Sequence, residues 1–124
     1  TFFATWCPPC VNQLEPLELV YQKYKNNKIK FFIIDGTEHH RKTWDEPWVQ
    51  DAPKTRQFLI DNKINIPFLE DTDVTGKKYG VKGIPTIVVV DKFGIIKLIR
   101  IGYTKDEEDL VGDLSEIIDK LLLD

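Results

Sequence analysis

Two short, almost wholly apolar runs constrain the fold of this 124-residue chain more than any other feature. Residues 29–34 (IKFFII) and 86–90 (TIVVV) are too short for buried helices and are rich in β-branched and aromatic side chains. Runs of this kind are typical of strands in a parallel or mixed sheet, because helices cover both faces of such a sheet. The rest of the chain must therefore supply those helices.

A helical pattern begins after the first ten residues. Leu14, Leu17, Tyr21 and Tyr24 recur at intervals of three and four, which predicts an amphipathic helix that Pro16 bends. A second helix is predicted from about residue 51 to residue 63. The last helix would carry an apolar face made of Leu110, Val111, Leu114, Ile117, Ile118 and Leu121.

The ends of these elements have their own signals. Thr104 and Glu107 have the spacing of a capping box before the last helix, and Asp73 is expected to cap a short helical turn. Residues 95–101 should return antiparallel beside the second apolar run, whereas residues 36–52 are expected to be irregular. The predicted order is strand, helix, strand, helix, strand hairpin and helix, which is that of an α/β sandwich with a mixed sheet.

The composition excludes several classes of protein. With 42% hydrophobic and 30% charged residues, the chain resembles an ordinary folded domain rather than a disordered one. No unbroken apolar run exceeds four residues, whereas a membrane span needs about 20. The net charge of −3 and the lack of a dense basic patch argue against nucleic acid as a partner. We expect residues 1–124 to form one domain.

The strongest chemical signal is Cys7-Pro8-Pro9-Cys10, at the expected junction between a strand and the first helix. Thiol–disulfide exchange requires a thiolate as the attacking group. The partial positive charge at a helix N-terminus lowers the pKa of a nearby thiol, so this position favours a reactive cysteine. We predict that Cys7 is the exposed nucleophile and that Cys10 is the resolving thiol.

Two other interpretations of the cysteine pair are weaker. A structural staple would contribute little, because closing so small a loop removes little entropy from the unfolded chain. A zinc site would need two more ligands, and only His39 and His40 are candidates. Adjacent histidines point apart in an extended chain, so we expect solvated loop residues there. We predict no metal and no cofactor beyond the Cys7–Cys10 pair.

Residues 2–10 (FFATWCPPC) and 83–94 (GIPTIVVVDKFG) resemble the thioredoxin superfamily. With residues 69–71 (LED) and 79–81 (YGV), they make the chain most similar to the TlpA/ResA-type extracytoplasmic thiol–disulfide oxidoreductases. The resemblance covers nearly the whole chain, although residues 36–52 match loosely. It implies a thioredoxin-like three-layer sandwich with a mixed central sheet flanked by helices.

The resemblance also implies roles for particular residues. Pro85 corresponds to a cis proline that faces the active-site disulfide, and the Ile84 backbone would pair with an extended substrate segment. A plain turn residue is the alternative for Ile84. Trp6, beside the nucleophile, fits a partly exposed rim residue better than a core aromatic. With Pro8 and Pro9, these residues form the predicted substrate-binding set.

By the same resemblance, the protein would exchange its dithiol or disulfide with protein substrates as a reductant outside the cytoplasm. The location would be the periplasm or the outer face of the cytoplasmic membrane, and cytochrome c maturation is a typical pathway of the family. The implied partners are protein disulfides and an upstream thiol protein that donates electrons. We expect a monomer.

Three features depart from the family pattern. Gln13 replaces the glutamate that usually follows the second cysteine by three residues and is thought to assist proton transfer. Thr1 stands where thioredoxins have a buried acid. The family's leading strands and helix would precede Thr1, and the chain has no methionine. We therefore expect truncated N-terminal strands and a native protein that continues upstream, with any signal peptide or membrane anchor before Thr1.

Three residues have two interpretations each. Asp35 ends a strand at the same sheet edge as Cys7 and could supply the missing proton-transfer acid, but an aspartate that bonds its own turn is favoured. Trp44 and Trp48 could cover the site or contact a partner. We favour a role in fixing their long segment to the domain, because long loops need apolar anchors.

Rival functions remain open. A cytosolic tryparedoxin- or nucleoredoxin-like reductase also fits residues 6–10 (WCPPC) and 43–46 (TWDE). The pair could instead bind metal in an assembly factor, or be redox-inert in a binding module. Because neither central proline has an amide proton, a Cys7 thiolate would be weakly stabilised, which favours a reducing couple with a potential below about −200 mV.

Overall fold

The computed structural model describes residues 1–72 and 74–123, so the cap predicted at Asp73 lies outside the described residues. Its helices are α1 (Pro8–Tyr24), α2 (Thr37–Thr43), α3 (Pro47–Gln50), α4 (Thr55–Asp61), α5 (Val74–Lys78) and α6 (Leu110–Leu123). Its strands are β1 (Phe2–Phe3), β2 (Ile33–Asp35), β3 (Phe68–Glu70), β4 (Thr86–Val90) and β5 (Ile96–Ile101).

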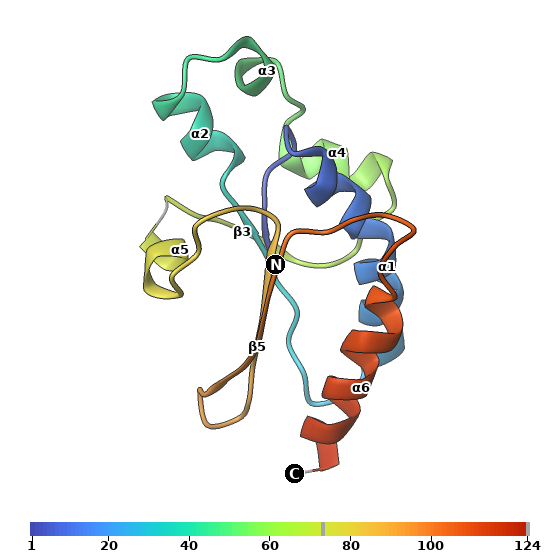
Figure 1. The fold of residues 1–124 in the computed structure, drawn as a ribbon. Coiled ribbons are helices and arrows are strands. Elements are labelled where there is room, and N and C mark those ends of the chain that lie inside the picture. The colour runs from blue at the N-terminus through green and yellow to red at the C-terminus, as the bar shows by residue number, and fades with distance from the viewer. Residues whose placement is uncertain (73, 124) are drawn as a thin grey trace.

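The strands form one mixed sheet in the order β3-β2-β1-β4-β5. Strand β2 is parallel to both β1 and β3, while β4 runs antiparallel to both β1 and β5. Figure 1 shows this sheet nearly edge-on, with α1 and α6 on one face and α5 on the other. The predicted three-layer α/β sandwich with a mixed sheet is confirmed.

Helix α1 supplies much of the core on its face of the sheet. Leu14, Leu17 and Tyr24 of the predicted stripe are buried, whereas Tyr21 is half-buried and Val20 takes a fully buried place beside them. The Tyr24 hydroxyl donates to the Asp119 carboxylate of α6 at 2.5 Å, so the two helices of this layer are joined by a polar contact as well as by packing. The layer holds the start of α1 in a fixed place at one end of the sheet.

The strand predicted at residues 29–34 is shorter and later than expected. Strand β2 begins only at Ile33, and Phe32 is exposed. The neighbouring strands β1 and β3 are two and three residues long, and on this stretch of the chain they pair with residues 33–35 alone. Apolar composition overestimated the strand because ladder partners decide where a strand forms.

The segment between β2 and β3 is more helical than predicted. Residues 36–52 are not irregular, because they contain α2 and α3. Helix α4 begins at Thr55 rather than near residue 51, and Lys54 stands at its N-cap without a side-chain hydrogen bond. These helices have two turns or fewer and no side-chain cap. The sequence therefore offers neither a long apolar periodicity nor a capping residue from which they could be predicted.

The predicted capping box before α6 is wrong. Glu108, rather than Glu107, accepts a hydrogen bond from the Thr104 amide. The helix itself begins later, and the Asp109 carboxylate accepts from the Gly112 amide in its first turn at 3.0 Å. Thr104 therefore closes a loop before α6 instead of capping the helix.

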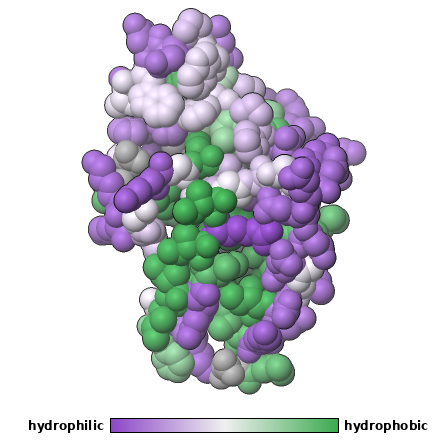
Figure 2. Space-filling model, in the orientation of Figure 1, coloured by the Kyte–Doolittle hydropathy of each residue, from purple (hydrophilic) through white to green (hydrophobic). Residues whose placement is uncertain are grey.

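Apolar side chains also reach the surface. Figure 2 shows them gathered over the hairpin of β4 and β5, where Ile95, Ile99 and Ile101 are exposed.

Within the described part of the chain, no helix combines the length and the apolar character needed to cross a membrane.

Candidate active site

Cys7 and Cys10 lie where β1 passes into α1, and a disulfide joins them with 5.2 Å between their Cα atoms. Cys7 is the N-cap residue of α1 and has an extended backbone (φ −99°, ψ 103°). Pro8 and Pro9 take the first helical positions, where an amide proton would have no intrahelical partner. The motif therefore both starts the helix and puts the cysteines at its positive end.

The sulfur of Cys7 has polar neighbours on two sides. The Cys10 amide donates to Cys7 Sγ at 3.3 Å, and the Ile84 carbonyl oxygen lies 3.9 Å from the same sulfur. Among the described residues, the Cys10 amide is the only main-chain group that donates to this sulfur. This agrees with the prediction that Pro8 and Pro9 remove the donors before Cys10.

Both cysteines are less accessible than expected. Cys7 is 3% exposed and Cys10 is 1% exposed in the disulfide form, so the prediction that Cys7 is exposed is wrong for this state. The reason is that Cys7 packs into the core cluster while the Ile84 carbonyl approaches its sulfur. Pro8 and Pro9 are the exposed part of the motif.

The segment before β4 lies next to the cysteines because β1 and β4 pair antiparallel at Phe2 and Thr86. The Ile84–Pro85 peptide bond is cis, as the resemblance implied. Pro85 is buried and Ile84 is half-buried. In the part of the chain that the structure describes, only the Cys7 sulfur lies within hydrogen-bond distance of the Ile84 backbone. That backbone is therefore open to pairing, as predicted.

Gln13 and Asp35, the two residues considered in relation to proton transfer, are both buried. Gln13 Oε1 accepts a hydrogen bond from the Thr1 hydroxyl at 2.9 Å. Asp35 Oδ1 accepts from the Thr37 amide at 3.1 Å and from the Thr37 hydroxyl at 2.6 Å. Asp35 thus bonds its own turn, which confirms the favoured interpretation of this residue.

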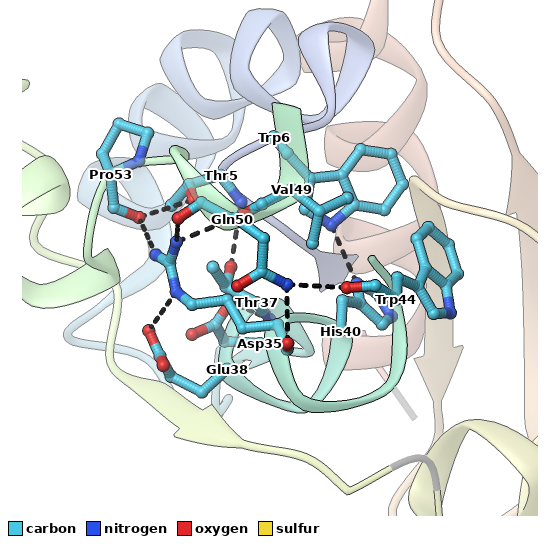
Figure 3. A network of polar contacts seen from close by, with 11 residues as sticks. Thr5, Trp6, Asp35, Thr37, Glu38, His40, Trp44, Val49, Gln50 and Pro53 are labelled. Atoms are coloured by element: carbon cyan, nitrogen blue, oxygen red, sulfur yellow. Dashed lines mark hydrogen bonds and ion pairs between the residues drawn. The ribbon is translucent and has the colours of Figure 1, made fainter. Parts of the chain in front are cut away.

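A polar network centred on Arg41 holds α2 and α3 together (Figure 3). The guanidinium of Arg41 donates to the carbonyls of Val49, Gln50 and Pro53 at 2.8 to 3.1 Å. It also pairs with the Glu38 carboxylate at 2.9 Å. Because one side chain meets three carbonyls at and just after the end of α3, it determines how this segment folds back on itself.

Thr5 connects this network to the cysteine motif. Its hydroxyl donates to the Pro53 carbonyl at 2.6 Å, and its amide donates to the Thr37 hydroxyl at 2.9 Å. Thr5 stands two residues before Cys7, so the turn that leads into the motif is bonded to both ends of the α2–α3 segment. Figure 3 shows these contacts on one side of Trp6.

Four rings form what we call the aromatic cluster: Trp6, His40, Trp44 and Trp48. Trp6 Nε1 donates to His40 Nδ1 at 2.9 Å, and the ring centroid of Trp6 lies 5.2 Å from Trp44 and 5.1 Å from Trp48. The His40 ring stacks on Trp44, with 4.6 Å between centroids and 14° between planes. These contacts agree with the interpretation that Trp44 and Trp48 fix their segment to the domain.

His39 and His40 are not the solvated loop residues that we expected, because both lie in α2 and are half-buried. Pairing of Asp35 with Thr37 starts this helix immediately after β2, which the sequence interpretation missed. Within residues 1–72 and 74–123, no group of three or more His, Cys, Asp or Glu side chains is arranged to hold a metal ion.

A family model described as Redoxin matches residues 1–115, which include the cysteine motif, the whole sheet and the first part of α6. The chain belongs to the redoxin family. This family match, together with similarity to curated ResA proteins, makes this redoxin a TlpA/ResA-like member of the thioredoxin superfamily, as the resemblance implied.

Curated relatives of this redoxin include the thioredoxin-like protein YneN of Bacillus subtilis, which is 26% identical over 92% of the chain and 62% of the relative. The thiol-disulfide oxidoreductase ResA of Halalkalibacterium halodurans is 24% identical over 94% of the chain and 59% of the relative. The chain thus spans about three fifths of the length of the curated relatives that it matches.

Among solved structures, this redoxin is similar to a thiol-disulfide isomerase from Corynebacterium glutamicum, with a TM-score of 0.73 and 22% identity. That match covers 99% of this chain and 78% of the other. StoA from Bacillus subtilis gives a TM-score of 0.64 at 23% identity and covers 93% of this chain and 76% of the other. These similarities show the thioredoxin-like fold.

Sequence reasoning overlooked Arg41 and Thr37 in this redoxin. A signal for Thr37 existed, because an aspartate two residues earlier at a strand end is typical of a side chain that bonds its own turn. Arg41 had no comparable signal. Its partners are backbone carbonyls of residues 49–53. The positions of these carbonyls depend on α2 and α3, two short helices that the sequence does not predict.

Proposed function

We propose that residues 1–124 of this redoxin are the redox domain of a thiol–disulfide oxidoreductase that exchanges its Cys7–Cys10 pair with disulfides of protein substrates. The observation that carries the proposal is the cysteine pair at the start of α1, with the open Ile84 backbone 3.9 Å from Cys7 Sγ. A helix end that favours thiolate, next to a backbone that can pair with an extended peptide, suits exchange with a protein disulfide.

In the proposed reaction, Cys7 is the nucleophile. Its thiolate attacks one sulfur of the substrate disulfide, a bond forms between that sulfur and Cys7 Sγ, and the other substrate sulfur leaves as a thiolate that takes up a proton. Cys10 then loses its proton and attacks Cys7 Sγ, which breaks the mixed disulfide and releases the second substrate thiol. Two electrons pass to the substrate, and the Cys7–Cys10 disulfide is the oxidised product.

The substrate segment is proposed to pair with the Ile84 backbone, beside Pro85, as an added extended strand. Trp6, Pro8 and Pro9 would form the rim that it crosses, and the exposure of the two prolines supports this placement. Side-chain selectivity at this pairing site would be low, because main-chain groups make the contact. Any selectivity must come from side chains beyond the rim.

The proposed direction is reduction of substrates outside the cytoplasm, with electrons supplied by an upstream thiol protein. Cytochrome c maturation is the proposed pathway, and a monomer is the proposed state. The similarity to ResA-type proteins supports the location, and the pathway follows from the resemblance of the sequence to that family. The scarcity of donors to Cys7 Sγ supports the direction, because weak stabilisation of the thiolate makes a couple reducing.

Equilibration with glutathione buffers of graded redox ratio tests this proposal. The fraction of Cys7–Cys10 disulfide, read by alkylation and mass spectrometry, should follow a reversible two-electron curve with a midpoint below about −200 mV. A midpoint above that value would make the protein an oxidant of its partners. A pair that does not equilibrate at all would support the redox-inert binding module instead.

A further inference from the structure

The aromatic cluster borders a surface pocket that the proposed exchange reaction does not use. The pocket has a volume of about 360 Å³ and lies between the end of α2 and the start of α3. Its lining consists of Thr43, Trp44, Asp45, Glu46 and Trp48. Two indole rings and two carboxylate side chains therefore border one space.

The carboxylates of this pocket stand outside the ion pairs of the described residues. Neither Asp45 nor Glu46 is a partner in any of them. Arg41, the arginine on the same segment, is engaged by Glu38 and by three backbone carbonyls. The pocket thus presents two carboxylates that take part in none of the ion pairs of the described residues, and Lys42 is the nearest basic residue along the chain.

The indole rings are accessible and are already held in place. Trp44 is 40% exposed and Trp48 is 54% exposed, although both contact Trp6 and the ring of His40 stacks on Trp44. The face of an indole attracts a cation more strongly than that of any other aromatic side chain. Because the rings are fixed beforehand, they lose little freedom when a ligand binds.

The pocket lies one ring away from the cysteine motif. Trp6 contacts both pocket tryptophans at about 5 Å between centroids, and it is the residue immediately before Cys7. The ring of Trp6 therefore stands between the cysteine motif and the pocket, and a polypeptide held at Cys7 would have the pocket on the far side of this ring.

We propose that this pocket binds an arginine side chain of the substrate protein near the disulfide that is reduced. A guanidinium is flat, stacks on indole rings and donates paired N–H groups to carboxylates, so it matches this lining better than a compact ammonium does. The proposal rests on the proposed function, since the arginine belongs to a disulfide substrate. It names the class of substrate that the exchange reaction selects.

Paired disulfide peptides test the proposal kinetically. The two peptides carry either arginine or citrulline, its neutral isostere, beside the cysteine, and kcat/KM is measured with reduced protein. We expect the arginine peptide to react about fivefold more efficiently at low salt, and the ratio to approach one at high salt, because cation–π contacts and exposed ion pairs are each modest and ion pairs are screened. Equal rates for both peptides at low salt would overturn the proposal.

Two double variants separate the pocket from overall charge. Asp45→Asn with Glu46→Gln removes the pocket's charges and should lower the arginine-to-citrulline ratio to below about twofold. Asp106→Asn with Glu107→Gln is the matched control, because it neutralises another adjacent pair of exposed acids that does not line the pocket. It should keep the full ratio. An equal loss in both variants would assign the preference to net charge and contradict the pocket.

A binding measurement distinguishes failure of the pocket from failure of the proposed function. The probe is N-acetylarginine amide, added to the oxidised protein while the indole N–H signals are followed by NMR. Signals of Trp44 and Trp48, assigned with Trp44→Phe and Trp48→Phe, should shift with arginine amide and not with citrulline amide. No shift would overturn the pocket even if the protein reduces disulfides. Shifts in a protein that reduces no disulfide would leave the pocket standing and reject the proposed function.

Discussion

Cys7 lies between two regions that are built in different ways. On one side, the Cys10 amide and the Ile84 carbonyl meet its sulfur, in positions set by the start of α1 and the pairing of β1 with β4. On the other side, the α2–α3 segment is held by long side chains, chiefly Arg41 and the rings of the aromatic cluster.

We interpret the backbone-built region as the site of the exchange reaction and the α2–α3 segment as a surface for substrate recognition. Groups that react must keep their geometry while substrates change, and backbone positions in a sheet and a helix start provide this. The α2–α3 segment instead exposes indole rings and carboxylates, which lie outside the backbone contacts of the cysteines. Thr5, two residues before Cys7, is hydrogen-bonded to Thr37 and to Pro53, so it couples the position of the cysteine motif to that of the α2–α3 segment.

The largest effect is expected at the buried side of the comparison. Cys7→Ser should lower the rate of insulin disulfide reduction by at least roughly a thousandfold, because the nucleophile is lost. Trp48→Phe, which keeps an aromatic ring on the exposed side, should lower it much less. If the two variants lost activity equally, the proposed division between chemistry and recognition would be wrong.

Arg41 tests the exposed side. Arg41→Met removes four charged hydrogen bonds and should lower the free energy of unfolding by about 2 kcal/mol, measured by urea denaturation. Amide exchange should accelerate in α2 and α3 before the rest of the protein. Arg56→Met is the control, since Arg56 is exposed and lies over the Phe68 ring, 5.2 Å from its centroid. If amide exchange instead accelerated equally in the sheet, the α2–α3 segment would not be a separate unit of local unfolding.

The Thr37 hydroxyl makes one of the bonds that connect the two regions. Thr37→Val should cost about 1–3 kcal/mol, because it leaves the buried Thr5 amide and Asp35 Oδ1 without this partner, whereas Thr37→Ser keeps the hydroxyl and should cost less. The Trp6 indole signal in NMR spectra should move in the valine variant. An unchanged Trp6 signal would mean that Thr5 does not transmit the position of the segment.

These two regions also differ in how far the sequence predicts them. The cysteine motif, the cis Ile84–Pro85 bond, β4 and the open Ile84 backbone could be predicted, because a helix start and a strand pairing follow from local composition and a known motif. The Arg41 network could not be predicted, since its partners are carbonyls brought together by the fold itself. Asp35 shows the intermediate case, where a local turn rule identified the bond but not the helix that follows it.

The smallest effect is expected outside both regions, at Glu108. The Thr104 amide, and then Arg100, lower the pKa of this carboxyl below its ordinary value. A carboxyl with a lowered pKa stabilises the folded state above its unfolded pKa near 4.5, and this contribution disappears as the pH falls through the folded pKa. Glu108→Gln should therefore destabilise the protein by no more than about 1 kcal/mol at pH 7 and by less at pH 3. A changed redox potential in this variant would show that the regions are not independent of α6.

The most direct test of the account is to trap the intermediate. Cys10→Ala, reduced and mixed with a disulfide-containing protein, should accumulate a mixed disulfide because the resolving thiol is absent. Peptide mapping by mass spectrometry should place the substrate on Cys7, and a Cys7→Ser variant treated in the same way should accumulate much less. Stable adducts at Cys10 in the Cys7→Ser protein but none at Cys7 in the Cys10→Ala protein would reverse the assigned roles and contradict the account.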